Sequence, residues 1–164
     1  MKAVFLAILF FGLAGHARAQ LNAKISEGIK QVSCAAPDEM NPVTLNAKLV
    51  REGDSIGIIV KVSMAEGWHI YGYVPSTLPY IPIDHILGLP KNIRAVGKWQ
   101  KTAASGSAAD PGVLIYEDEA VFVHKAVKLP GAKAGEIIKA GLYYQVCNLR
   151  QCLAPAEKIL ELRL

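Results

Sequence analysis

The chain lacks the sequence signatures of several common kinds of chemistry. It has no glycine-rich phosphate-binding loop, no Gly-x-Ser-x-Gly motif and no Cys-x-x-Cys-His motif, which argues against nucleotide binding, acyl transfer and covalent haem attachment. There are three cysteines and four dispersed histidines, and their spacing matches no metal-binding motif. We therefore predict no cofactor and no metal.

Positive charge is too low and too scattered for a nucleic-acid-binding protein. The net charge is +4, and it falls to +2 if the signal peptide described below is removed with Lys2 and Arg18. The basic residues form no cluster and do not alternate with aromatic residues. We therefore expect no nucleic-acid partner.

No apolar run is long enough to span a bilayer. The longest one extends from Ala3 to Gly15, follows Lys2, and precedes the small-x-small triplet 17–19. This order predicts a secretory signal peptide over residues 1–19, cleaved after Ala19. Because no cysteine follows to carry a lipid, we expect an exported, periplasmic protein without membrane insertion, in a compartment where disulfides persist.

Short alternating segments separated by proline, glycine and polar turns dominate the rest of the chain. No segment shows a convincing helical period, and residues 20–42 read as a leader segment without a firm element. Residues 75–90 contain four prolines and are expected to be mostly loop. The pattern predicts an all-β domain over residues 43–164, an antiparallel β-sandwich. The expected strands are 43–49, 58–64, 68–71, 93–96, 113–116, 120–129, 137–147 and 160–164.

The most informative stretch is Tyr143–Pro155, which contains two of the three cysteines. Cys147 ends an apolar strand, four mostly polar residues follow, and Cys152 begins the returning arm. Cysteines on both sides of so short a turn can approach within disulfide distance without help from the rest of the fold.

Two roles fit this cysteine pair. In the chain-entropy model a structural disulfide across about six residues contributes about 2.2 kcal/mol, whereas pairing Cys34 with Cys147 across about 114 residues would contribute about 4.8 kcal/mol. A purely stabilising disulfide would favour the longer loop, so the short spacing favours a redox role. A structural disulfide in a non-catalytic, β-sandwich binding module is the alternative. A metal site formed by the pair and His69 has suitable ligand types but a poor spacing.

Two motifs in this order resemble the amino-terminal periplasmic domain of the disulfide reductase DsbD. They are Gly67-Trp68-His69-Ile70-Tyr71 and Cys147-Asn148-Leu149-Arg150-Gln151-Cys152-Leu153-Ala154-Pro155. The resemblance covers the chain from about Asn41 to its end. It implies an immunoglobulin-like sandwich that passes electrons from a thioredoxin-like protein or a membrane disulfide reductase to periplasmic thiol proteins.

The resemblance also implies roles for individual residues. Cys147 and Cys152 match the redox-active pair, with Cys152 forming the mixed disulfide and Cys147 resolving it. His69 and Tyr71 match aromatic positions that line the site. The best-known member of the family has an acidic pair and a phenylalanine before a tyrosine in a lid over the cysteines, whereas here residues 113–115 precede Tyr116. Ile115 is the candidate shield, and Tyr116 is expected to line the site beside it. The carboxylates are missing.

Two further residues have more than one interpretation. Arg150, in the turn, is either a charge that stabilises a departing thiolate or an ordinary solvated side chain. The odd thiol, Cys34, is either free, bridged to a second copy of the chain, or paired transiently with the other two cysteines.

Overall fold

The computed structural model describes residues 19–164, so the predicted signal peptide lies outside the described residues except for Ala19. Within this range the chain forms one helix, at residues 19–31, followed by eleven strands. No helix in the described part is long and apolar enough to cross a membrane. The strands are β1 (Val43–Glu52), β2 (Ser55–Met64), β3 (His69–Tyr73), β4 (Asp84–Gly88), β5 (Ile93–Lys101), β6 (Ser105–Gly106), β7 (Leu114–Glu117), β8 (Glu119–Lys128), β9 (Ile137–Tyr144), β10 (Val146–Cys147) and β11 (Ala156–Arg163).

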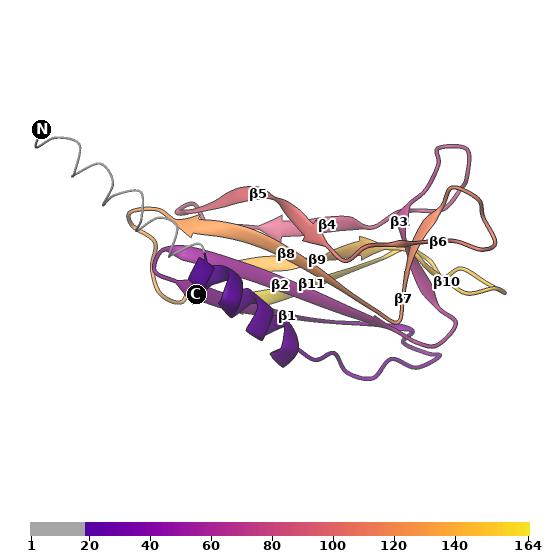
Figure 1. The fold of residues 1–164 in the computed structure, drawn as a ribbon, viewed down its shortest axis with the longest axis horizontal. Coiled ribbons are helices and arrows are strands. Elements are labelled where there is room, and N and C mark those ends of the chain that lie inside the picture. The colour runs from indigo at the N-terminus through magenta and orange to yellow at the C-terminus, as the bar shows by residue number, and fades with distance from the viewer. Residues whose placement is uncertain (1–18) are drawn as a thin grey trace, which may run out of the picture.

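The strands form three antiparallel sheets. One has the order β1-β2-β8-β5, the second β11-β9-β4, and the third β10-β3-β7-β6. The first two run along the length of the molecule and face each other, and the third lies at one end (Figure 1). The predicted all-β antiparallel sandwich is confirmed, and the cysteine pair lies in the end sheet.

Alternation along the strands explains where the main core lies. On β2 the side chains of Ile58, Val60 and Val62 point between the sheets and are fully buried, as period-two geometry requires. Ile138, Ala140 and Leu142 of β9 meet them from the opposite sheet. Trp68 and Ile70 extend the same core toward the end sheet.

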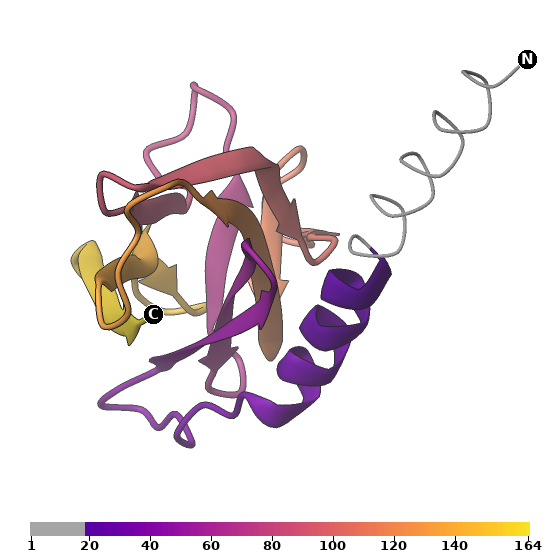
Figure 2. The same ribbon diagram turned by 90° about the vertical axis from the view of Figure 1, so that its left-hand side faces the viewer.

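The leader segment differs from our expectation. Residues 19–31 are helical, and this helix lies against the outer face of the β1-β2-β8-β5 sheet (Figure 2). Leu21 and Ile25 are buried against Ile59 and Val123. Gly57 of β2 makes room for the helix, because a Cβ added there would lie 2.6 Å from a side-chain carbon of Ile25. Apolar residues recur every three or four positions along this segment, and so short a pattern did not predict a helix.

A second difference concerns the proline-rich stretch. Residues 84–88 form β4, which pairs with β9, although 75–90 was expected to be mostly loop. The prolines lie on either side of this strand and not within it, so its backbone donors remain available for the sheet. β5 and β11 are also longer than predicted, since their neighbours supply hydrogen bonds that the sequence pattern does not reveal.

An aromatic cluster fills the core between β4, β5 and β8. The His85 ring lies 5.1 Å from Trp99 and 4.8 Å from Phe122, and Trp99 lies 5.0 Å from His124. His85 Nε2 is buried and has no hydrogen-bond partner among the described residues. Burial, followed by the charge of Lys101, lowers the pKa of His85 to about 4, while Asp84 opposes the shift.

We predict that the 19–31 helix stabilises the sandwich through its buried face. Ile25→Asp should lower the free energy of unfolding by about 3 kcal/mol, because the change removes apolar burial and places a charge against β2 and β8. Urea unfolding followed by circular dichroism measures this. Ser26→Asp, one residue further along and exposed, is the matched control. A loss below about 0.5 kcal/mol for Ile25→Asp would mean that the helix does not contribute to domain stability.

We also predict an acid-sensitive component of stability from His85. Because its pKa is lower in the folded protein than the ordinary 6.5, the unfolded chain takes up the proton first as the pH falls. The stabilising contribution is therefore complete above pH 6.5 and is lost toward pH 4, by about 1.5 kcal/mol after allowing for partial exposure. Urea unfolding of the wild type and of His85→Phe at pH 7.5 and pH 4.5 tests this. The variant should lose less stability between the two values, and equal losses would contradict the prediction.

Candidate functional site

A disulfide closes the hairpin at the end of the molecule. Cys147 and Cys152 are bonded, with their Cα atoms 4.0 Å apart, as the short spacing predicts. The hairpin projects from the end sheet beyond β10 (Figure 1). The two cysteines also face each other as an isolated antiparallel bridge, so the backbone itself brings the sulfurs together.

Hydrogen bonds hold this turn independently of the disulfide. The backbone N–H of Asn148 donates to the carbonyl of Gln151 at 2.9 Å, and that of Leu153 donates to Val146 at 2.9 Å. The side-chain oxygen of Asn148 accepts from the N–H groups of Arg150 and Gln151, at 2.8 and 2.9 Å. This Asx-type turn reverses the chain with backbone hydrogen bonds that are present in addition to the disulfide.

The two sulfurs have different environments. Cys147 is 1% exposed and belongs to an apolar cluster with Tyr71, Val113 and Ile115. Cys152, in contrast, is exposed. An attacking thiolate needs an in-line approach to a sulfur, and only Cys152 offers its surface to solvent.

Strand β3 carries the two aromatic residues predicted to line the site. His69 is the register partner of Cys147 on the neighbouring β10. Tyr71 lies two residues further on the same face, and its hydroxyl is 4.0 Å from Cys152 Sγ. The rings of His69 and Tyr71 meet edge to face at 5.1 Å. Both residues are therefore brought beside the disulfide.

The residues proposed as a lid lie on β7 and divide between two faces. Ile115 pairs in register with Tyr71 and lies in the apolar cluster that contains Cys147. Tyr116 points the other way, into the main core, where its ring lies 5.3 Å from Phe122. The structure thus brings Ile115 to the site and leaves Tyr116 in the sandwich.

The loop between β3 and β4 also covers the site. No sequence pattern predicted this contact. Tyr80 stacks on Tyr71, with ring centroids 4.7 Å apart and the planes inclined by 10°. The loop is fastened beside β9 and β10 because the N–H of Ile81 donates to the side chain of Gln145 at 3.1 Å. Val74 and Leu78 complete the cover. The sequence shows Tyr80 as an aromatic residue among prolines, but only the folded loop shows that its ring lies on Tyr71.

Arg150 is exposed at the tip of the hairpin. Its backbone N–H is used in the turn, and its guanidinium makes no ion pair or hydrogen bond with the described residues. The side chain therefore stands free beside Leu149, which is 91% exposed. This tip is the most accessible apolar and cationic feature next to Cys152.

Electrostatics keep the two aromatic site residues uncharged near neutral pH. Burial lowers the pKa of His69, an effect that the charges of Glu117 and Asp110 oppose. Burial, with smaller contributions from Tyr80 and Asp110, raises the pKa of Tyr71 to about 12. Tyr71 thus retains its proton wherever the cysteines titrate, and it can act as a hydrogen-bond donor.

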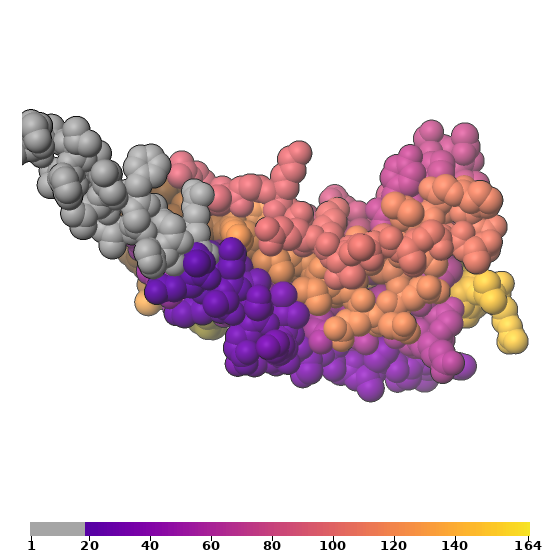
Figure 3. All heavy atoms as spheres, in the orientation of Figure 1, coloured from indigo at the N-terminus to yellow at the C-terminus, as the bar shows by residue number. Residues whose placement is uncertain are grey.

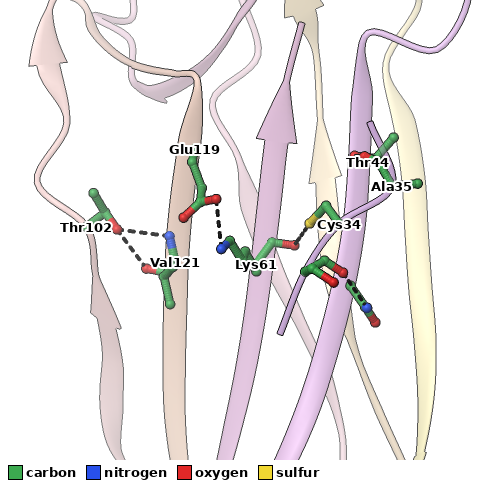
Figure 4. Close-up of polar contacts among 9 residues, drawn as sticks. Cys34, Ala35, Thr44, Lys61, Thr102, Glu119 and Val121 are labelled. Atoms are coloured by element: carbon green, nitrogen blue, oxygen red, sulfur yellow. Dashed lines mark hydrogen bonds and ion pairs between the residues drawn. The ribbon is translucent and has the colours of Figure 1, made fainter. Parts of the chain in front are cut away.

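The third cysteine lies elsewhere. Cys34 is a free, half-buried thiol whose Sγ donates to the carbonyl of Lys61 on β2 at 3.3 Å (Figure 4). Burial raises its pKa. It belongs to neither the disulfide nor the apolar cluster around it.

Comparison with known proteins gives a fold but no close relative. No family model matches the chain, and no curated protein matches it. Among solved structures, the N-terminal periplasmic domain of ScsB from Proteus mirabilis is 17% identical and superimposes with a TM-score of 0.53 over 79% of this chain and 49% of that one. The chain therefore spans about half the length of that structure.

Two structures from Neisseria meningitidis are also similar. The DsbD N-terminal domain in its reduced form is 17% identical, with a TM-score of 0.45 over 73% of this chain and 84% of that one. A complex of the DsbD N-terminal domain with the PilB N-terminal domain gives 17% identity and a TM-score of 0.43, over 71% and 80% respectively. The superposition on the ScsB domain shows that this chain shares the fold of that periplasmic domain, in agreement with the predicted β-sandwich.

We predict that the three thiols of the reduced protein react at very different rates. A short pulse of iodoacetamide at pH 7.5 should label exposed Cys152 at least about tenfold faster than buried Cys147, since alkylation needs an accessible thiolate. Cys34 should also lag behind Cys152, because burial raises its pKa. Peptide mass spectrometry reads each site separately, and equal labelling of Cys147 and Cys152 would contradict the inferred asymmetry.

Proposed function

We propose that this DsbD-like domain is a periplasmic thiol-disulfide exchange protein, which accepts electrons from a thioredoxin-like donor or a membrane disulfide reductase and passes them to periplasmic thiol proteins through Cys147 and Cys152. The observation that carries the proposal is a disulfide with one buried and one exposed sulfur, on a turn that hydrogen bonds already hold. The predicted export of the chain to an oxidising compartment supports it.

The exchange follows from this asymmetry. A donor thiolate attacks Cys152 Sγ, the intramolecular S–S bond breaks, and Cys147 leaves as a thiolate that takes up a proton. The second donor thiol, deprotonated, then attacks the donor sulfur in the mixed disulfide and releases Cys152. The pair gains two electrons and two protons while the donor dithiol becomes a disulfide. Reaction with an oxidised acceptor protein runs the same steps in reverse.

The surroundings of the pair suit repeated oxidation and reduction. The Asn148 turn and the β10–β3 pairing do not require the disulfide, so the hairpin can keep its shape when the bond opens. Buried Cys147 is protected from unrelated thiols, yet it stays within reach of Cys152. Leu149 and Arg150 project beside the exposed sulfur and are the first groups that an approaching partner meets.

We predict that Cys147→Ser traps partners and that Cys152→Ser does not. Without Cys147, a mixed disulfide on Cys152 has no intramolecular thiol to resolve it and accumulates. Both variants are expressed in a Cys34→Ser background, so that the odd thiol cannot contribute, and adducts are separated on non-reducing gels. Mass spectrometry of the adduct then identifies the partner. Equal trapping by both variants would overturn the assigned roles.

The reduction potential separates exchange from a purely structural disulfide. A structural disulfide in an exported protein lies below about −300 mV, whereas an exchange site lies higher and equilibrates with thioredoxin-like proteins. Incubation in glutathione or dithiothreitol buffers, followed by thiol counting, gives the value. A potential below about −300 mV, together with no adduct from either variant, would favour the structural role and the non-catalytic binding module.

A further inference from the structure

The Tyr71 hydroxyl is held in one place beside Cys152 by the packing of its ring. Tyr71 is 2% exposed in the middle of β3, with Tyr80 stacked on it and the His69 ring against it edge to face. The N–H of Ile83 donates to the carbonyl of Tyr71 at 2.7 Å, which fastens the covering loop to the same residue. The ring cannot swing away without displacing that loop, so its hydroxyl stays directed at the sulfur.

This hydroxyl is the one side-chain group within hydrogen-bonding distance of Cys152 Sγ in the described part of the chain, at 4.0 Å. The neighbouring polar side chains either bond to other groups or have no partner among the described residues. The Asn148 side chain accepts hydrogen bonds from the turn N–H groups. The Arg150 guanidinium points into solvent. The other ionisable groups around the site are His69, Tyr80, Asp110, Glu117 and Arg150.

A phenol beside a sulfur favours one protonation state of that sulfur. Since burial keeps Tyr71 protonated at neutral pH, its hydroxyl donates and does not accept a proton from the thiol. Hydrogen bonds to a charged acceptor are stronger than those to a neutral thiol or disulfide. The contact is therefore expected to strengthen when Cys152 becomes a thiolate.

We propose that Tyr71 is a catalytic residue whose hydroxyl donates a hydrogen bond to the Cys152 thiolate, and so stabilises that thiolate both as nucleophile and as leaving group. This inference rests on the proposed exchange function. In the reduced protein, Cys152 as a thiolate attacks one sulfur of an acceptor disulfide, and the other acceptor sulfur leaves as a thiolate. Cys147, after losing its proton, then attacks Cys152 Sγ, which forms the intramolecular disulfide and releases the first acceptor sulfur. Both acceptor thiolates take up protons. Tyr71 keeps its proton throughout, so two electrons and two protons pass to the acceptor.

The test is the titration of Cys152 in a Cys34→Ser, Cys147→Ser background, where it is the remaining thiol. Thiolate absorbance at 240 nm is followed from pH 4 to pH 10, with and without Tyr71→Phe, which preserves the ring and its stacking. Loss of the hydroxyl should raise the pKa of Cys152 by about one unit, a tenfold lower ratio of thiolate to thiol at a given pH. Tyr144→Phe, in the main core with a pKa also raised to about 12, is the matched control and should leave the titration unchanged.

A second measurement needs no change at Tyr71. With tyrosine labelled by carbon-13 at Cζ, the Tyr71 signal in the Cys34→Ser, Cys147→Ser protein should move with the same midpoint as the Cys152 thiolate. Two results would overturn the proposal. One is a Cys152 titration midpoint that is unchanged in a folded Tyr71→Phe variant, and the other is a Tyr71 signal that does not shift when the Cys152 thiolate forms. Neither measurement uses a partner protein, so a failure of the exchange function in the trapping experiment is a separate result.

Discussion

The arrangement of the site depends on strand β3 being paired on both of its edges while its two faces serve different purposes. One face puts Ile70 into the main core, next to Trp68 just before the strand, which fixes the strand to the sandwich. The other face carries His69 and Tyr71, with β10 along one edge and β7 along the other. Because strand side chains alternate, anchoring one face determines where the other points. Burial in the core therefore positions the side chains that surround the disulfide.

The chemical asymmetry of the disulfide follows from this sheet. Cys147 is part of β10 and shares the apolar cluster under the covering loop, whereas Cys152 begins the returning arm outside the sheet. A disulfide that was buried at both ends would not reach partners, and one exposed at both ends would react with any thiol. Placing one sulfur in a strand and the other beyond the turn gives a protected thiol and an accessible one.

The 19–31 helix and the half-buried His85 show a different kind of constraint. The helix lies over part of the outer face of the β1-β2-β8-β5 sheet (Figure 3). It buries Ile59 and Val123 of that sheet. His85 places an imidazole among aromatic rings where its charged form is disfavoured, which makes part of the stability depend on pH. Neither feature touches the disulfide, so the domain can be stabilised or destabilised at these positions without altering the thiol chemistry.

Most strands, the sandwich class and the pairing of Cys147 with Cys152 can be predicted from the sequence, because they depend on periodicity and on a short turn. Strand β4 and the full lengths of β5 and β11 cannot, since they depend on their neighbours in the sheets. The resemblance to a known family predicts that His69 and Tyr71 line the site beside the two cysteines. The exposure of Cys152 agrees with its place after a polar turn, but the stacking of Tyr80 on Tyr71 and the packing of the 19–31 helix on the sheet are visible only in the folded structure. These features depend on contacts between segments far apart in the chain, which a local pattern does not encode.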